Sequence, residues 1–97
     1  MVQFATESNQ LVCRFEGQLD TAACQEWGEA LIKQVQAARQ PVVFDLHGIS
    51  YVASMFLRLC VQAAKEVGAG NFSLVNVTPP VKRVFMMAGL DKQLNVQ

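Results

Sequence analysis

Apolar residues along this chain switch repeatedly between the two-residue period of a strand and the longer period of a helix, and this alternation restricts the possible folds most. The run at residues 11–16 predicts the second of two opening strands, which a hairpin turn at residues 7–10 joins to the first. Asp20 or Thr21 then offers an N-cap for a helix that reaches Ala38. The apolar stripe of that helix consists of Cys24, Trp27, Leu31 and Val35.

The middle of the chain repeats the order of a strand followed by a helix. Residues 42–46 form an apolar run interrupted only by Asp45, which is typical of a central strand covered on both faces. A second helix is expected at residues 54–67, where polar and apolar residues separate onto opposite faces. Gly68 ends this helix, because glycine adopts the left-handed conformation at low cost. Residues 72–77 predict a further strand.

A third helix is expected after that strand. Thr78 and Pro79 form a favourable N-cap and first-turn pair, Gly89 closes the helix, and residues 90–96 predict a short final strand. The order is therefore β-β-α-β-α-β-α with a final β. It predicts one α/β domain over residues 1–97, with a mixed β-sheet packed with three or four helices. The sequence leaves open whether the helices cover one face of the sheet or both.

The charge balance argues against several kinds of partner. Lys+Arg and Asp+Glu number 8 each, whereas a protein that coats nucleic acid or an anionic membrane carries a basic excess. The N-terminal segment lacks the basic and then apolar order of a secretory signal. No apolar stretch approaches the roughly 20 residues that cross a bilayer. We expect a cytoplasmic protein with no nucleic-acid partner and no direct membrane insertion.

The cysteines and the single histidine offer little chemistry. Cys13, Cys24 and Cys60 are odd in number and widely spaced, which predicts buried reduced thiols and no disulfide framework. One histidine without any clustered cysteines supplies too few ligands for a metal site. We therefore expect neither a metal nor another cofactor.

Three segments of the chain resemble, in the same order, the motifs of one known domain family. Residues 17–20, Gly-Gln-Leu-Asp, resemble the family's G-x-L-D turn. Residues 42–52, VVFDLHGISYV, resemble its hydrophobic strand with the following Asp, Leu and aromatic-aliphatic pair. Residues 74–90, LVNVTPPVKRVFMMAGL, resemble its late strand and the helix that ends in Gly-Leu. Their shared order and spacing span nearly the whole chain, and they imply a STAS-like domain of the anti-sigma factor antagonist type.

The family's D-S-[ST]-G-L-G stretch corresponds to residues 53–58, Ala-Ser-Met-Phe-Leu-Arg. Ser54 and Leu57 match this pattern, whereas the aspartate and both glycines are replaced. Ser54 falls on the position at which family members accept a phosphate from a partner kinase. The resemblance thus implies a protein that binds an anti-sigma factor of the serine kinase type when unmodified and is released when phosphorylated.

Ser54 and Arg58 each have two possible roles. A serine that opens a helix commonly acts only as an N-cap. As a phosphoacceptor, Ser54 would carry roughly −1.5 to −2 units of charge at neutral pH, which a helix N-terminus stabilises. Arg58 lies four residues on, where it is suited either to pair with that phosphate or to form a permanent contact with a partner. Phe56 is expected to pack in the core and Arg58 to point outward.

Asp45 sits in an otherwise apolar strand, and this strand is expected to lie near the beginning of the second helix. It is a candidate partner-binding residue, because loops converge at the carboxyl ends of strands, or else a cap for the next turn. Asp45, His47 and Ser54 are the residue types of a hydrolase triad, but no G-x-S-x-G motif accompanies them. We therefore expect a protein that is not an enzyme.

Three methionines are candidates for a contact surface. Met55 lies at the edge of the second helix's apolar face, and Met86 or Met87 must leave the buried stripe of the third helix. Such side chains either fill gaps in a core or form an adaptable interaction surface. The expected partner-binding residues are Asp45, Ser54, Met55, Arg58 and Met86.

Two functions follow from these observations. The first is an anti-sigma factor antagonist-like module that binds a kinase-type anti-sigma factor and is switched by phosphorylation of Ser54. The second is a constitutive STAS-like subunit of a lipid-transport ABC system, whose partner is the transporter ATPase. The replaced aspartate and glycines motivate the second function, because a structural subunit does not need to admit a kinase.

Overall fold

The computed structural model describes the backbone of residues 1–97 and every side chain except that of Ala69. Strands and helices alternate after an opening hairpin, as the sequence predicts. The elements are β1 (Val2–Glu7), β2 (Gln10–Phe15), α1 (Thr21–Ala38), β3 (Val42–Asp45), α2 (Ser54–Val67), the short 3-10 helix η1 (Ala69–Asn71), β4 (Phe72–Val75) and α3 (Pro79–Met87).

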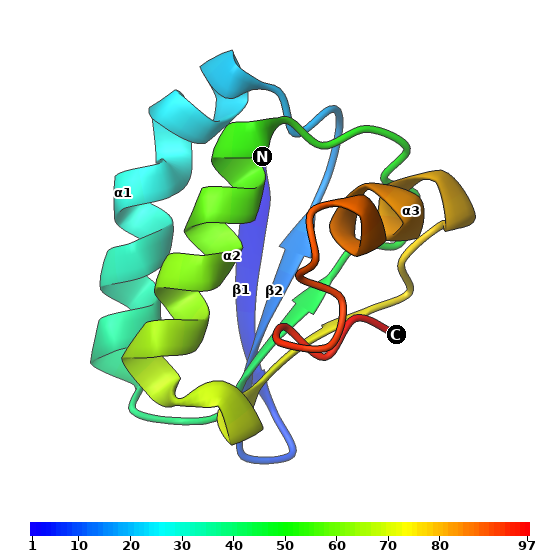
Figure 1. Cartoon of the computed structure of the whole chain (residues 1–97). Helices are drawn as coiled ribbons and strands as arrows, with labels where there is room; N and C mark the ends of the chain where they lie inside the picture. Colours follow the sequence, from blue (N-terminus) through cyan, green and yellow to red (C-terminus); the bar gives the residue numbers. More distant parts are fainter.

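The four strands form one mixed sheet in the order β1-β2-β3-β4. β1 and β2 are antiparallel, whereas β2, β3 and β4 are parallel. Figure 1 shows α1 and α2 side by side in front of the strands, with α3 beside α2 near the ends of β3 and β4. The predicted α/β class and the mixed sheet with three helices are confirmed. The open question of coverage is also answered, because α1 and α2 cover the same face.

The opening hairpin turns at Ser8 and Asn9, which have φ angles of +52° and +62°. Two consecutive positive φ angles match the hairpin turn whose twist suits the flanking strands. Asparagine tolerates this region better than most residues, so the turn is favoured at Asn9. The resulting register places Phe4 opposite Cys13 and Val2 opposite Phe15, with all four side chains directed to the helical face of the sheet.

Aromatic rings join the sheet to both long helices. The ring of Phe15 on β2 lies 5.1 Å from Phe44, 5.2 Å from Phe56 and 5.5 Å from Trp27, measured between centroids. Phe44 extends the cluster to Phe72 on β4 at 4.9 Å. Buried aromatic pairs in such tilted and edge-to-face arrangements add about 0.5–1.5 kcal/mol each beyond their buried area. This cluster fixes α1 and α2 over the sheet.

Two predicted features differ in the structure. Residues 90–96 form turns and contribute only one isolated bridge, Val96 to Leu74, so the expected final strand is wrong. Hydrogen bonds from Leu94 N–H to the Leu90 carbonyl and from Val96 N–H to the Asp91 carbonyl curl this segment. The strand expected at residues 72–77 ends early, because the next residue after Val75 has a left-handed conformation.

None of the helices in the described chain combines the length and apolar character that crossing a lipid bilayer requires.

Candidate functional site

The loop that leads into α2 is fastened to the turn that leads into α1. The backbone N–H of Leu19 donates to the Tyr51 carbonyl at 3.2 Å, and the N–H of Ala53 donates to the Leu19 carbonyl at 2.8 Å. These bonds form an isolated parallel bridge between Leu19 and Val52. Two of the segments that resemble the STAS family thus meet in space, and together they fix where α2 begins.

The same loop is also held from the side of α3. The Thr78 hydroxyl donates a 2.9 Å hydrogen bond to the Ile49 carbonyl. Thr78 is the N-cap residue of α3, as predicted, yet its side chain makes no capping bond to that helix. Because the hydroxyl serves the neighbouring loop, the beginnings of α2 and α3 are tied to each other.

Ser54 is the first residue of α2 and is exposed to solvent. The N-cap position belongs to Ala53, which has no side-chain acceptor, so the interpretation of Ser54 as an N-cap is wrong by one position. Within the described chain, the Ser54 hydroxyl makes no hydrogen bond. The predicted helix start at Ser54 with an outward hydroxyl is confirmed.

The first turn of α2 contains no acidic residue. The N–H of Phe56 donates to the Ala53 carbonyl at 2.9 Å, but no partner for the N–H of Ser54 or Met55 is found among the described residues. The positive end of the helix dipole therefore meets solvent beside the Ser54 hydroxyl without a neutralising side chain. Such a helix start accommodates an anion.

The two residues that replace the family's glycines lie on opposite sides of α2. Phe56 is fully buried in the aromatic cluster, whereas Arg58 is exposed, as both were predicted to be. Arg58 forms no ion pair with any described residue. Of the two replacements, only Arg58 changes the surface that a partner would meet.

Large apolar side chains are exposed on the loop before α2 and on α3. Tyr51, three residues before Ser54, is 50% exposed, and Met86 and Met87 on α3 are 55% and 82% exposed. Met55 is half-buried and packs against the core. The sequence predicted that one of the two α3 methionines leaves the buried stripe, and in the structure both do.

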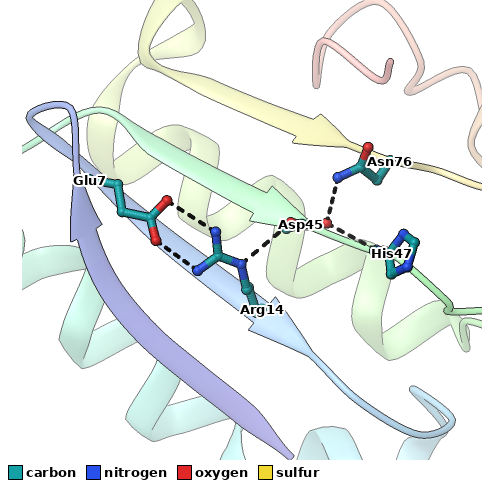
Figure 2. A network of polar contacts seen from close by, with 5 residues as sticks. All are labelled: Glu7, Arg14, Asp45, His47 and Asn76. Atoms are coloured by element: carbon teal, nitrogen blue, oxygen red, sulfur yellow. Dashed lines mark hydrogen bonds and ion pairs between the residues drawn. The ribbon is translucent and has the colours of Figure 1, made fainter.

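Asp45 belongs to a polar network on the face of the sheet opposite the helices, seen from that side in Figure 2. Its Oδ1 atom accepts hydrogen bonds from the His47 backbone N–H and from Asn76 Nδ2, each 3.0 Å long. Its Oδ2 atom lies 3.6 Å from Nε of Arg14. Arg14 also donates two bonds to Glu7, at 2.8 and 3.0 Å, and these hydrogen bonds lower the pKa of the Glu7 carboxyl.

These contacts assign Asp45 to holding the ends of β2, β3 and β4 together. The bond to His47 N–H is the turn cap that the sequence offered as one of two roles for Asp45. None of its contacts in Figure 2 reaches the beginning of α2, so the structure does not bring Asp45 to Ser54. His47 contributes only its backbone to this network, and its ring makes no hydrogen bond to Ser54 or Asp45 among the described contacts.

All three cysteines lie among the described residues and are buried and free, which agrees with the prediction of buried thiols. Burial raises the pKa of the Cys13 thiol to about 12 and that of Cys60 well above its usual value. The thiols are therefore protonated and unreactive at neutral pH.

Sequence reasoning missed the role of Leu19, whose backbone positions α2, and the bond from Thr78 to Ile49. Backbone pairing between two loops leaves no signal in residue type, so Leu19 was not identifiable in this role. The bond from Thr78 was missed because its hydroxyl was expected to cap the third helix. Tyr51 was considered only as part of the segment at residues 42–52, although an aromatic residue three positions before a candidate helix start was an available signal.

Comparisons with known proteins agree with this architecture. An anti-sigma factor antagonist from Mycobacterium paratuberculosis is 22% identical, with a TM-score of 0.85 over 99% of this chain and 83% of that chain. The anti-sigma factor antagonist SpoIIAA in its unphosphorylated form is 20% identical, with a TM-score of 0.75 over 100% of this chain and 86% of that chain. The Bacillus cell fate determinant SpoIIAA in the phosphorylated form is 18% identical, with a TM-score of 0.69 over 100% and 91%.

At these identities the solved structures establish a shared fold. A search of curated protein sequences returned no match. The family model described as the STAS domain matches residues 2–97. Because this match spans nearly the whole sequence, the chain belongs to the STAS domain family.

Proposed function

We propose that this chain is a non-catalytic interaction module of the anti-sigma factor antagonist type, which acts in the cytoplasm. It binds a kinase-type anti-sigma factor through the surface around the beginning of α2. Phosphorylation of Ser54 by that partner ends the complex. The observation that carries the proposal is the Ser54 hydroxyl, which is exposed and unbonded at a helix start that loop hydrogen bonds fix in place.

The comparisons support the class of function. Similar structures are described as anti-sigma factor antagonists, and one of them, SpoIIAA, is described in both an unphosphorylated and a phosphorylated form. A phosphorylated state is therefore known for a protein with this fold.

The local electrostatics suit a phosphate on Ser54. The unpaired N–H groups of Ser54 and Met55 and the absence of an acidic residue in the first turn favour a negative charge there. Arg58, one turn on, is free to pair with the phosphate. Modification would leave the fold intact, because the Ser54 side chain has no internal contact to lose.

The docking surface combines this polar centre with apolar area. The free protein exposes three large side chains with apolar surface, namely Tyr51, Met86 and Met87. Aromatic residues, methionine and arginine are enriched at the centres of protein interfaces. Asp45 takes no part in this surface in our proposal, since its contacts lie on the other face of the sheet.

The proposal is tested with a purified anti-sigma factor kinase encoded near the gene for this chain. We expect phosphate transfer from ATP to Ser54, located by mass spectrometry, and weaker kinase binding afterwards. The Ser54→Ala variant should bind without being modified. Ser50→Ala is the matched control, because Ser50 is also exposed but lies in the loop. Phosphate on another residue, or binding unaffected by phosphorylation, would contradict the switch.

The alternative function, a transporter subunit, is motivated by the large side chains Phe56 and Arg58 at the family's two glycine positions. Phe56 is buried, so only Arg58 could obstruct a kinase. Replacing Arg58 by glycine distinguishes the two functions. An antagonist should keep or strengthen its affinity for the kinase in Arg58→Gly, whereas a subunit that uses Arg58 as a fixed contact should lose affinity for the transporter ATPase.

A further inference from the structure

A surface groove of about 340 Å³ runs along α2, on the side away from α1. In Figure 1 this side of α2 faces the segment that follows α3, drawn in orange to red. Leu90 of that segment lines the groove together with α2, so the open groove lies between two parts of the chain. Its lining residues are Leu57, Arg58, Val61, Gln62, Lys65 and Leu90.

The floor of the groove is aliphatic. Leu57, Val61 and Leu90 are half-buried, with one part of each side chain against the core and the rest open to solvent. Leu57 and Val61 are four residues apart and lie on one face of the helix. From Leu57 to Lys65 the groove extends about 12 Å, roughly two helical turns. It therefore has the length and apolar character of a site for a short helical segment.

The rim of the groove is basic. Arg58 and Lys65 are exposed, and the described residues offer neither of them an ion-pair partner. No acidic residue lines the groove. The groove between α1 and α2 differs, because there Lys33 is paired with Glu29 at 3.3 Å. Two uncompensated positive charges beside an aliphatic floor select a partner with aliphatic and acidic side chains together.

We propose that this groove docks an amphipathic helix of a partner protein, with aliphatic residues at helical spacing and Asp or Glu along the edges. A helix in such a groove presents anchors at i, i+3 or i+4, and i+7, which matches two turns of α2. The inference rests on the proposed function only for the partner's identity, which would be the anti-sigma factor. Arg58 then belongs to both the groove and the Ser54 surface, so one partner can cover the two.

A pair of synthetic peptides tests the groove without the natural partner. The first is a helix-forming peptide with leucine at i, i+4 and i+7 and glutamate on both edges, and the second carries lysine in place of each glutamate. Titration into the isotope-labelled full chain is followed by NMR. We expect saturable binding of the acidic peptide, with the largest shift changes at the methyl groups of Leu57, Val61 and Leu90, and clearly weaker binding of the basic peptide.

Charge reversal supplies the matched variants. Lys65→Glu should lower the affinity for the acidic peptide by roughly threefold or more, since it replaces an attraction by a repulsion. The same variant should raise the affinity for the basic peptide. Lys33→Glu on α1 makes the same change in net charge outside the groove and should leave both affinities unchanged. Equal binding of the two peptides, no saturable binding, or shift changes centred elsewhere would overturn the inference.

The anti-sigma factor separates failure of this inference from failure of the proposed function. If the anti-sigma factor binds the wild-type chain and Lys65→Glu equally well, and the acidic peptide shows no saturable binding, the groove inference is wrong and the proposed function stands. If the acidic peptide occupies the groove but no anti-sigma factor binds, the inference about the groove holds and the proposed function is wrong.

Discussion

The backbone N–H of Ala53 donates a 2.8 Å hydrogen bond to the carbonyl of Leu19, and this bond joins the starts of the two long helices. Leu19 is fully buried and precedes the N-cap of α1, whereas Ala53 is itself the N-cap of α2. The position of Ser54 therefore depends on the turn before α1, where Leu19 lies 35 residues before Ser54 in the chain. Stability of that turn and exposure of Ser54 are linked.

The N-cap of α1 should contribute measurably to stability. Asp20 accepts a 2.8 Å hydrogen bond from the Ala23 backbone N–H. Asp20→Ala should lower the free energy of unfolding by about 1 kcal/mol, because the N–H loses its acceptor. Asp20→Ser, which keeps an acceptor, should lose far less. Urea unfolding followed by circular dichroism measures both, and equal losses in the two variants would contradict the capping role.

Thr78 should act as a hydrogen-bond donor to Ile49 and not as a helix cap. Thr78→Asp introduces a favourable capping residue that cannot donate to the Ile49 carbonyl at neutral pH. We expect Thr78→Asp and Thr78→Val each to lower the free energy of unfolding by about 1 kcal/mol, while Thr78→Ser should stay near the wild type. If Thr78→Asp matched or exceeded the wild type in a urea titration, the hydroxyl would be serving α3.

Gly28 allows the close approach of α1 to α2. A Cβ atom at this position would lie 3.2 and 3.3 Å from the two methyl groups of Leu59. Gly28→Val should therefore lower the free energy of unfolding by about 1–3 kcal/mol through overpacking. In a Leu59→Ala background the same replacement should lose less, since the opposing methyl groups are gone. Additive losses in the double variant would show that the helices do not meet here.

The buried thiol of Cys13 should make the protein less stable at alkaline pH. Its pKa is raised from 9.0 to about 12 in the folded state, so the unfolded chain releases its proton first as the pH rises. Stability is then full below about pH 9 and falls above it by up to about 1.4 kcal/mol per pH unit, until the pH reaches about 12.

Urea unfolding at pH 8 and pH 10 measures how steeply the free energy of unfolding falls with pH, which is the effect expected from Cys13. The matched variant is Cys13→Ala, which removes the titrating group from the same strand position and should flatten the decline. Comparing each protein with itself at the two pH values cancels the loss of packing caused by the shorter side chain. An unchanged slope in Cys13→Ala would assign the alkaline instability to other groups.

Local patterns were sufficient for most of the elements. The start of α1 was predicted from Asp20, its buried face from the stripe of Cys24, Trp27 and Leu31, and the end of α2 from Gly68. These signals are local, because capping and amphipathic spacing act within one or two turns. The strand predicted at residues 90–96 was wrong because that prediction also used only local patterns. Its apolar residues fit a strand locally, but Leu94 is turned into the core by bonds within the segment.

The candidate site was only partly visible in the sequence. Ser54 was identified through its motif and its place at a helix start, and Arg58 through its polar stripe. Asp45 was grouped with them because loops converge at the carboxyl ends of strands in an α/β fold. Consecutive residues of a strand point to opposite faces of the sheet. In the structure Phe44 therefore points to the helical face, and the side chain of Asp45 points to the other face.

By itself the sequence determined the α/β order, the burial of Phe56 and the outward position of Arg58, since periodicity and side-chain polarity dictate these within a single element. Only the tertiary structure decided that both long helices share one face of the sheet, that Leu19 positions Ala53, and that Leu90 lines a basic groove along α2. These relationships join residues far apart in the chain. They depend on how elements pack, which no local pattern encodes.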